Sequence, residues 1–68
     1  MDNHPLWLSE KAVSQLTGIS VSTLQKNRFY RRGIPYSKVG RSVRYAVHDV
    51  ELFMNSHRIT MKKEALNA

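Results

Sequence analysis

Cysteine is absent from this 68-residue sequence, so neither a disulfide framework nor a thiolate metal site can stabilise the fold. Long apolar runs are absent too, and no stretch approaches the roughly 20 residues of a membrane span. The first residues, MDNHPLWLSEKAV, lack the basic segment followed by an apolar run that marks a secretory signal. We therefore expect a cytoplasmic protein with no membrane association, stabilised by one small hydrophobic core.

Acidic residues are missing from positions 11 to 48, in a chain with 11 Lys and Arg, 5 Asp and Glu, and a net charge of +6. The bases within this acid-free span are Lys11, Lys26, Arg28, Arg31, Arg32, Lys38, Arg41 and Arg44. A contiguous positive surface attracts polyanions and speeds their encounter. The charge pattern favours nucleic acid as the partner, while a membrane surface, an acidic protein or a basic but inert surface stay open.

Patterns of catalytic and metal-binding residues are also missing. His4, His48 and His57 form no His-Glu-x-x-His motif and have no cysteine partners. The segment GIPYSKVG lacks the Gly-Lys-Ser/Thr ending of a phosphate-binding loop, and no serine lies in a Gly-x-Ser-x-Gly elbow. The sequence therefore predicts a protein that is not an enzyme and that uses neither a metal nor a cofactor.

The first helix is predicted to begin after Ser9, which is a plausible N-cap, with the Glu10 carboxylate in its first turn. The apolar residues Ala12, Val13 and Leu16 follow at helical spacing. Gly18 should end this helix, because glycine readily takes the left-handed conformation that closes a helix.

A second helix is predicted from Ser20, its N-cap, to about Tyr30 or Arg31. Leu24 would be the buried anchor on the face that it shares with Val21 and Arg28. The opposite face would carry Ser22, Gln25, Lys26 and Phe29. Two capped helices joined by TGIS indicate a helix-turn-helix, with an αα-hairpin used only for packing as the alternative.

The periodicity changes after Gly33, since Ile34-Pro35 excludes a continuing helix. The runs YSKV and SVRY alternate in polarity around GR, which predicts a β-hairpin with Arg41 at its tip. A third helix is expected over VHDVELFMNSH, with Val47, Val50, Phe53 and Met54 at helical spacing.

This order of elements predicts a mainly α fold with a small β-hairpin: a winged helix-turn-helix over residues 1–57, in which the hairpin is the wing. The polar tail, residues 58–68, is expected to be frayed or disordered. Trp7 could anchor a partner or pack beneath the first helix. We expect the second, because one large aromatic residue is a sizeable share of so small a core.

Residues 6 to about 57 resemble the MerR-like, AlpA-type excisionase family, which consists of small winged helix-turn-helix proteins of prophages and mobile elements. The matching motifs are LTGIS followed by STL across the turn, RGIPY and KVGR with VRY across the wing, and HDVELFM in the last helix. One departure is Asn27, which stands where many relatives carry a tryptophan shortly after the Thr-Leu pair, with Phe29 two residues later.

The resemblance implies binding of double-stranded DNA without catalysis. Its members act as excisionases, which bind and bend attachment-site DNA to direct an integrase towards excision, or as prophage transcription regulators. Both roles use the same scaffold. A phage-type integrase and other copies of the chain, bound cooperatively on DNA, are further candidate partners, with residues 58–68 as a candidate contact between copies.

The candidate DNA-binding residues fall into two groups. The expected phosphate contacts are Arg31, Arg32, Lys38, Arg41 and Arg44, with Ser20 and Ser22 at a helix N-terminus. The expected base contacts are Thr23, Gln25, and Lys26 or Arg28. Two of these have alternatives: Thr23 could form a local hydrogen bond in the first helical turn, and Arg28 could pack across the edge of the core. Arg41 could enter a narrow minor groove or only follow the backbone.

Overall fold

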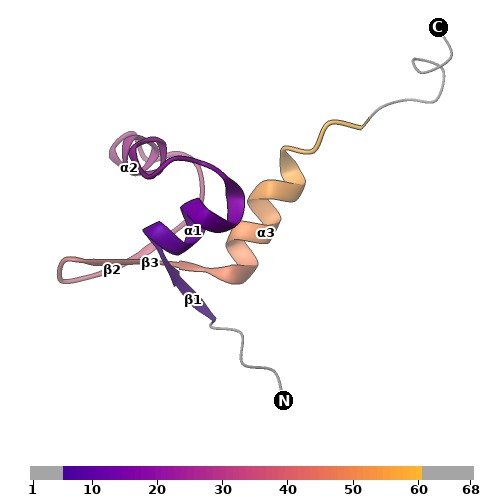
Figure 1. Ribbon diagram of the computed structural model, residues 1–68. Helices are drawn as coiled ribbons and strands as arrows, with labels where there is room; N and C mark the ends of the chain where they lie inside the picture. Colours follow the sequence, from indigo (N-terminus) through magenta and orange to yellow (C-terminus); the bar gives the residue numbers. More distant parts are fainter. Residues whose placement is uncertain (1–5, 61–68) are drawn as a thin grey trace, which may run out of the picture.

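The computed structural model describes residues 6–60, so the first residues and most of the predicted tail (61–68) lie outside the described part. The elements follow one another as β1 (Trp7–Ser9), α1 (Glu10–Thr17), α2 (Val21–Phe29), β2 (Ser37–Val39), β3 (Ser42–Ala46) and α3 (Val47–Ser56). A helix-turn-helix, a hairpin and a third helix confirm the predicted winged helix-turn-helix fold. Figure 1 shows the hairpin of β2 and β3 extending away from α3.

Both predicted caps of the helix-turn-helix are present. The Ser9 hydroxyl accepts a hydrogen bond from the Ala12 amide at 3.1 Å, and the Ser20 hydroxyl accepts one from the Thr23 amide at 3.1 Å. Gly18 closes α1 with φ at 79°, and its amide donates to the Ser14 carbonyl at 2.8 Å. The turn therefore follows from local residue chemistry.

The sheet contains one strand more than the sequence predicted. Its order is β1-β3-β2 and both pairings are antiparallel, so β1 extends the wing hairpin across β3. Within β1, Leu8 packs against the core, whereas Trp7 is 51% exposed opposite Ala46. The prediction that Trp7 packs beneath the first helix is wrong, because successive residues of a strand point to opposite faces and Leu8 takes the inward position.

The core is small, and its residues come from positions 8 to 53 of the chain. Its buried residues are Val13, Leu24, Ile34, Tyr45 and Val50, with Leu8, Ile19, Val43 and Phe53 packed against them. Leu24 is the predicted anchor of α2. On α3 the core face is narrower than predicted, because Met54 is 39% exposed.

The turn of the wing and the N-terminus of α3 each have a specific backbone feature. Gly40 has φ at 59° and is followed by Arg41 at the tip of the wing, which fits the glycine-first requirement of a type II′ hairpin turn. The N-cap residue of α3, Ala46, provides no side-chain hydrogen bond, but the Val47 amide donates to the Leu6 carbonyl at 3.0 Å. The segment before β1 therefore satisfies a backbone donor of α3.

Candidate nucleic-acid interface

One side of α2 is open to solvent. Leu24 is buried on the other side, and residues separated by three, four or seven positions share a face of a helix. We define the recognition face as the four exposed residues that lie away from Leu24: Ser22, Gln25, Lys26 and Phe29. This agrees with the face predicted from the helical period.

Hydroxyl groups at the N-terminus of α2 form a local cluster. The Ser20 hydroxyl donates to Thr23 Oγ1 at 2.9 Å and lies 3.2 Å from Ser22 Oγ. Thr23 thus makes the local hydrogen bonds that were its alternative to a base contact, although its side chain stays exposed. The cluster leaves hydroxyl groups and a helix N-terminus on the solvent side, where a phosphate oxygen can be bound.

The Arg28 side chain forms an ion pair with another residue of the protein. Its Nε lies 2.7 Å from Glu10 Oε2, and its second nitrogen, Nη2, donates to Glu10 Oε1 at 3.2 Å. The guanidinium also lies over the Tyr36 ring, 5.6 Å from the centroid. The alternative of an Arg28 packed at the edge of the core therefore describes the geometry better than a guanine contact.

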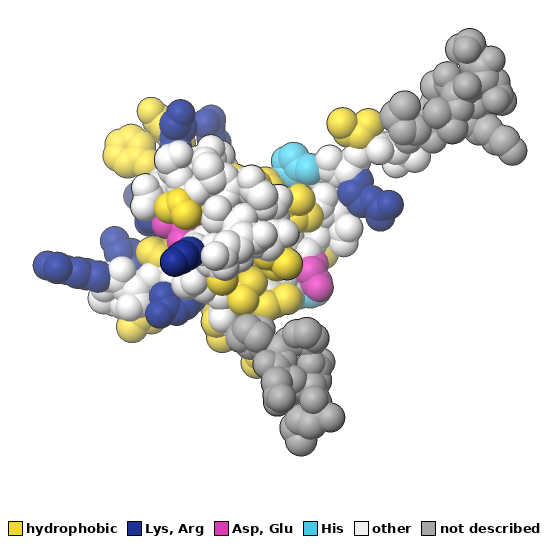
Figure 2. Space-filling view, viewed as in Figure 1, with side chains coloured by type: hydrophobic (Ala, Val, Ile, Leu, Met, Phe, Trp, Pro, Cys, Tyr) yellow, Lys and Arg dark blue, Asp and Glu magenta, His cyan; other side chains and the backbone are white. Residues whose placement is uncertain are grey.

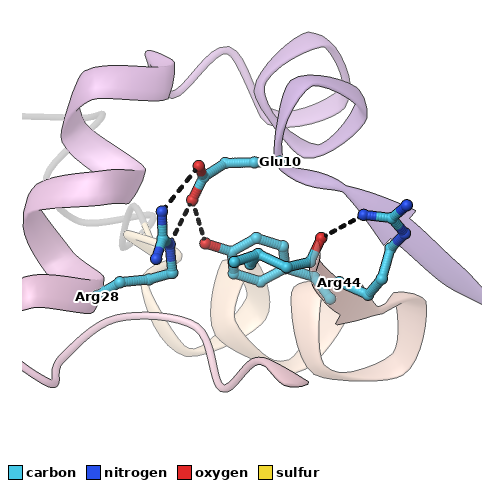
Figure 3. A network of polar contacts seen from close by, with 5 residues as sticks. Glu10, Arg28 and Arg44 are labelled. Carbon is cyan, nitrogen blue, oxygen red and sulfur yellow. Dashed lines mark hydrogen bonds and ion pairs between the residues drawn. The ribbon is translucent and has the colours of Figure 1, made fainter. Parts of the chain in front are cut away.

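Glu10 connects three elements. Besides Arg28 of α2, the carboxylate of this α1 residue accepts a hydrogen bond from the Tyr45 hydroxyl of β3 at 2.7 Å (Figure 3). We call Glu10, Arg28 and Tyr45 the carboxylate hub. Because the hub joins α2 to β3, the central strand of the sheet, it fixes the relative orientation of α2 and the wing.

The charges of the hub stabilise one another. Partial burial acts to raise the pKa of Glu10, but the hydrogen bonds from Arg28 and Tyr45 outweigh it, so this pKa is lowered from 4.5. The Gln25 side chain adds to the lowering. The hydrogen bond to Glu10 raises the pKa of Arg28, and burial followed by the same carboxylate raises the pKa of Tyr45. Glu10 therefore stays ionised at neutral pH and Tyr45 stays protonated.

The C-terminus of α2 ends in an unusual cap. The Arg32 amide donates to the Asn27 carbonyl at 2.8 Å, and the Arg31 amide donates to the Arg28 carbonyl at 3.0 Å. These are the two hydrogen bonds of a Schellman motif, which places Arg31 at the left-handed position that glycine prefers. Arg31 has φ at 56° and is the only non-glycine residue with positive φ among residues 6–60.

A shallow cavity of about 460 Å³ follows this cap. Its lining residues run from Arg31 to Tyr36. The Arg32 guanidinium lies 5.2 Å from the centroid of the Tyr30 ring, and its Nε donates to Asn27 Oδ1 at 3.2 Å. Arg31 and Arg32 are both exposed, so two cations line a hollow of the surface between α2 and the wing.

The wing carries exposed cations on both of its faces. Lys38 pairs with Val43, which packs against the core, and Arg44 pairs with Ser37 on the opposite face. Arg44 Nη1 donates to the Val43 carbonyl at 2.8 Å, and Figure 3 shows this side chain apart from Glu10 and Arg28. With Arg41 at the tip, the wing can approach phosphates on either side of a groove.

The candidate residues thus form a basic surface over α2, the segment that follows it and both faces of the wing. Figure 2 shows Lys and Arg side chains over α2 and along the wing. The sequence predicted these residues but missed Glu10 and Tyr36 as the groups that hold Arg28. Glu10 is the last acid before the acid-free span, and a lone carboxylate beside many bases was an available signal for an ion pair.

Two properties of residues 6–60 concern metal binding and membranes. Within this part of the chain, no group of three or more His, Cys, Asp or Glu side chains is placed to hold a metal ion. None of its helices is long and apolar enough to cross a membrane.

The fold and the exposed second helix define a winged helix-turn-helix protein. The sequence model of the family described as a helix-turn-helix domain matches residues 7–58, and the chain belongs to this family. Searches of curated proteins and of solved structures found no match. Family membership supports sequence-specific binding of double-stranded DNA, the ligand of helix-turn-helix domains.

Proposed function

We propose that this protein is an excisionase: it binds attachment-site DNA through α2 and the wing, bends it, and directs an integrase towards excision. The observation that supports this most directly is the fixed relative placement of two exposed elements, α2 and the wing. The carboxylate hub joins the helix that carries the recognition face to the basic wing, and in this proposal both contact one duplex. The role in excision rests on the resemblance to AlpA-type proteins.

In this proposal one group of residues binds phosphates and another contacts base edges. The cations that bind phosphates are Arg31, Arg32, Lys38, Arg41 and Arg44, all of them exposed, with Ser20 and Ser22 at the N-terminus of α2. Gln25 and Lys26 read base edges in the major groove, where an amide pairs with adenine and an ammonium with guanine. Thr23 supports the first turn of α2, and Arg28 holds the helix in place.

Paired substitutions test this division of roles. Gln25→Ala should relax the preference at one base pair, at a cost of roughly 1–3 kcal/mol for the preferred base. Arg41→Ala should weaken binding to all sequences nearly equally, because phosphates carry no sequence information. Fluorescence anisotropy with a selected duplex and its single-base variants, in the presence of heparin, measures both. Identical profiles for the two variants would refute the division.

Excision itself requires a functional assay. The protein should stimulate an integrase from the same mobile element to recombine its attachment sites, and a duplex labelled at both ends should show increased energy transfer when the protein bends it. A transcription regulator with the same binding mode would bind a promoter and leave excision unchanged. That result would replace the excisionase proposal while retaining DNA binding.

A further inference from the structure

Phe29 is an exposed aromatic residue inside the basic surface. Its side chain is 79% exposed, more than that of any other large hydrophobic residue in the helices of the described part. Its ring makes an edge-to-face contact with Tyr30, with a distance of 5.0 Å between centroids, and Tyr30 is itself 60% exposed. The pair adds little to the core, so packing does not account for an aromatic residue at this position.

The position of Phe29 on α2 places it among the residues proposed to read bases. It follows Gln25 by four positions and Lys26 by three, so the three side chains share the recognition face. A residue on this face enters the groove together with its neighbours. A ligand that spans Gln25 and Lys26 on this face can therefore also contact the Phe29 ring.

The charges around Phe29 select the kind of ligand. Lys26, Arg31 and Arg32 are exposed nearby, and Glu10, an acid that contacts α2, is already paired with Arg28 and Tyr45. A matching ligand is negative at its rim and offers an apolar group at its centre. The major groove of DNA has this arrangement, because phosphates line its edges and the thymine methyl group is its apolar feature.

We infer that Phe29 is a specificity-determining residue that contacts the methyl group of a thymine in the major groove. This rests on the proposed function, since it requires α2 to bind duplex DNA. Insertion of the ring between bases is disfavoured, because such wedges act from the minor groove, whereas Phe29 lies on a helix that enters the major groove.

The test removes the methyl group from the DNA. A preferred site is first selected from random duplexes with the full chain, and each thymine is then replaced singly by deoxyuridine, which pairs identically but lacks the methyl group. At one position the wild-type protein should bind the deoxyuridine duplex about fourfold more weakly, as expected for one lost apolar carbon. Phe29→Ala should bind both duplexes equally at this position, and Phe29→Leu should keep part of the discrimination.

Matched controls separate this contact from a structural role. Leu52→Ala removes another exposed apolar side chain, 53% exposed on α3, and should discriminate like the wild type. Thermal unfolding should be nearly unchanged for Phe29→Ala, since the ring is mostly in solvent. Discrimination at no thymine, equal discrimination by Phe29→Ala, or a change only in the number of copies bound would overturn the inference. A wild-type protein that binds no duplex in the presence of heparin would instead overturn the proposed function, and the inference with it.

Discussion

Arg31 holds a backbone conformation that most residues avoid. A left-handed conformation costs an L-residue roughly 1–2 kcal/mol, and glycine normally occupies this position of a Schellman motif. In this chain the nearest glycine, Gly33, comes two residues later, with φ at 90° and a Cβ position only 3.0 Å from Asn27 Cβ. Strain kept at an exposed cation points to a role for that cation, and phosphate binding is the role we propose.

Replacing Arg31 should therefore separate stability from binding. We expect Arg31→Gly to raise the free energy of unfolding by about 1 kcal/mol, because the strain is removed, and to lower the affinity for DNA. Arg31→Lys keeps both the strain and the charge and should change little. Urea unfolding and anisotropy measure the two quantities, and a destabilised Arg31→Gly would show that the backbone carries no strain.

Local chemistry at single residues was the most predictable part of the fold. The caps Ser9 and Ser20 and the end of α1 at Gly18 follow from short-range hydrogen bonding, and all are found in the structure. The conformation of Arg31 was not predictable, because residue preferences put glycine there. The exposure of Phe29 did follow from the helical period.

Among the helices and strands, α2 is linked to the wing by Glu10. The carboxylate of this α1 residue binds Arg28 on α2 and Tyr45 on β3, residues 18 and 35 positions away. Sequence periodicity predicted the helices and the hairpin because their patterns are local. It missed the hub and the pairing of β1 with β3, because both depend on residues far apart in the chain.

Glu10→Gln tests the hub. We expect it to lower the free energy of unfolding by about 1–2 kcal/mol at neutral pH, because hydrogen bonds to a charged group are lost. A carboxyl group with a lowered pKa stabilises the fold above its ordinary pKa of 4.5, and this contribution disappears as pH falls through the folded-state value. The difference between wild type and Glu10→Gln should therefore shrink below about pH 4.5.

Urea unfolding between pH 7 and pH 3 measures this difference. Glu51→Gln is a suitable control, since Glu51 is an exposed residue of α3 outside the hub. A difference that stays constant with pH would contradict the assignment of the lowered pKa. Weaker DNA binding by folded Glu10→Gln at pH 7 would support the role of the hub in orienting α2.

The whole molecule combines a small core with a large positive charge. Its net charge of +6 was visible in the sequence, but the placement of the charged side chains on the surface was not. The structure places the candidate bases on α2, on the segment after it and on both faces of the wing, and Lys11, an exposed residue of α1, lies outside the proposed contacts. The distribution of charged residues therefore predicts how many counterions are released when the protein binds DNA.

If the five proposed phosphate-binding cations act together, the logarithm of the association constant should fall with the logarithm of salt concentration at a slope of about −4 to −5. Each substitution to alanine among them should make the slope less steep by about 1, and Lys11→Ala should leave it unchanged. Titrations at several salt concentrations give the slope. A flat response would refute an electrostatic mechanism.

The turn of the wing has a consequence for how such a protein can diversify. A Cβ added at Gly40 would meet no atom within 4 Å apart from its chain neighbours, and the nearby residues Val39, Arg41 and Ser42 are all exposed. Exposed turns of this kind tolerate insertions, because extra residues there disturb no packed contact. The length of the wing can therefore change through evolution or engineering without rebuilding the core, and with it the distance over which the hairpin can follow a duplex.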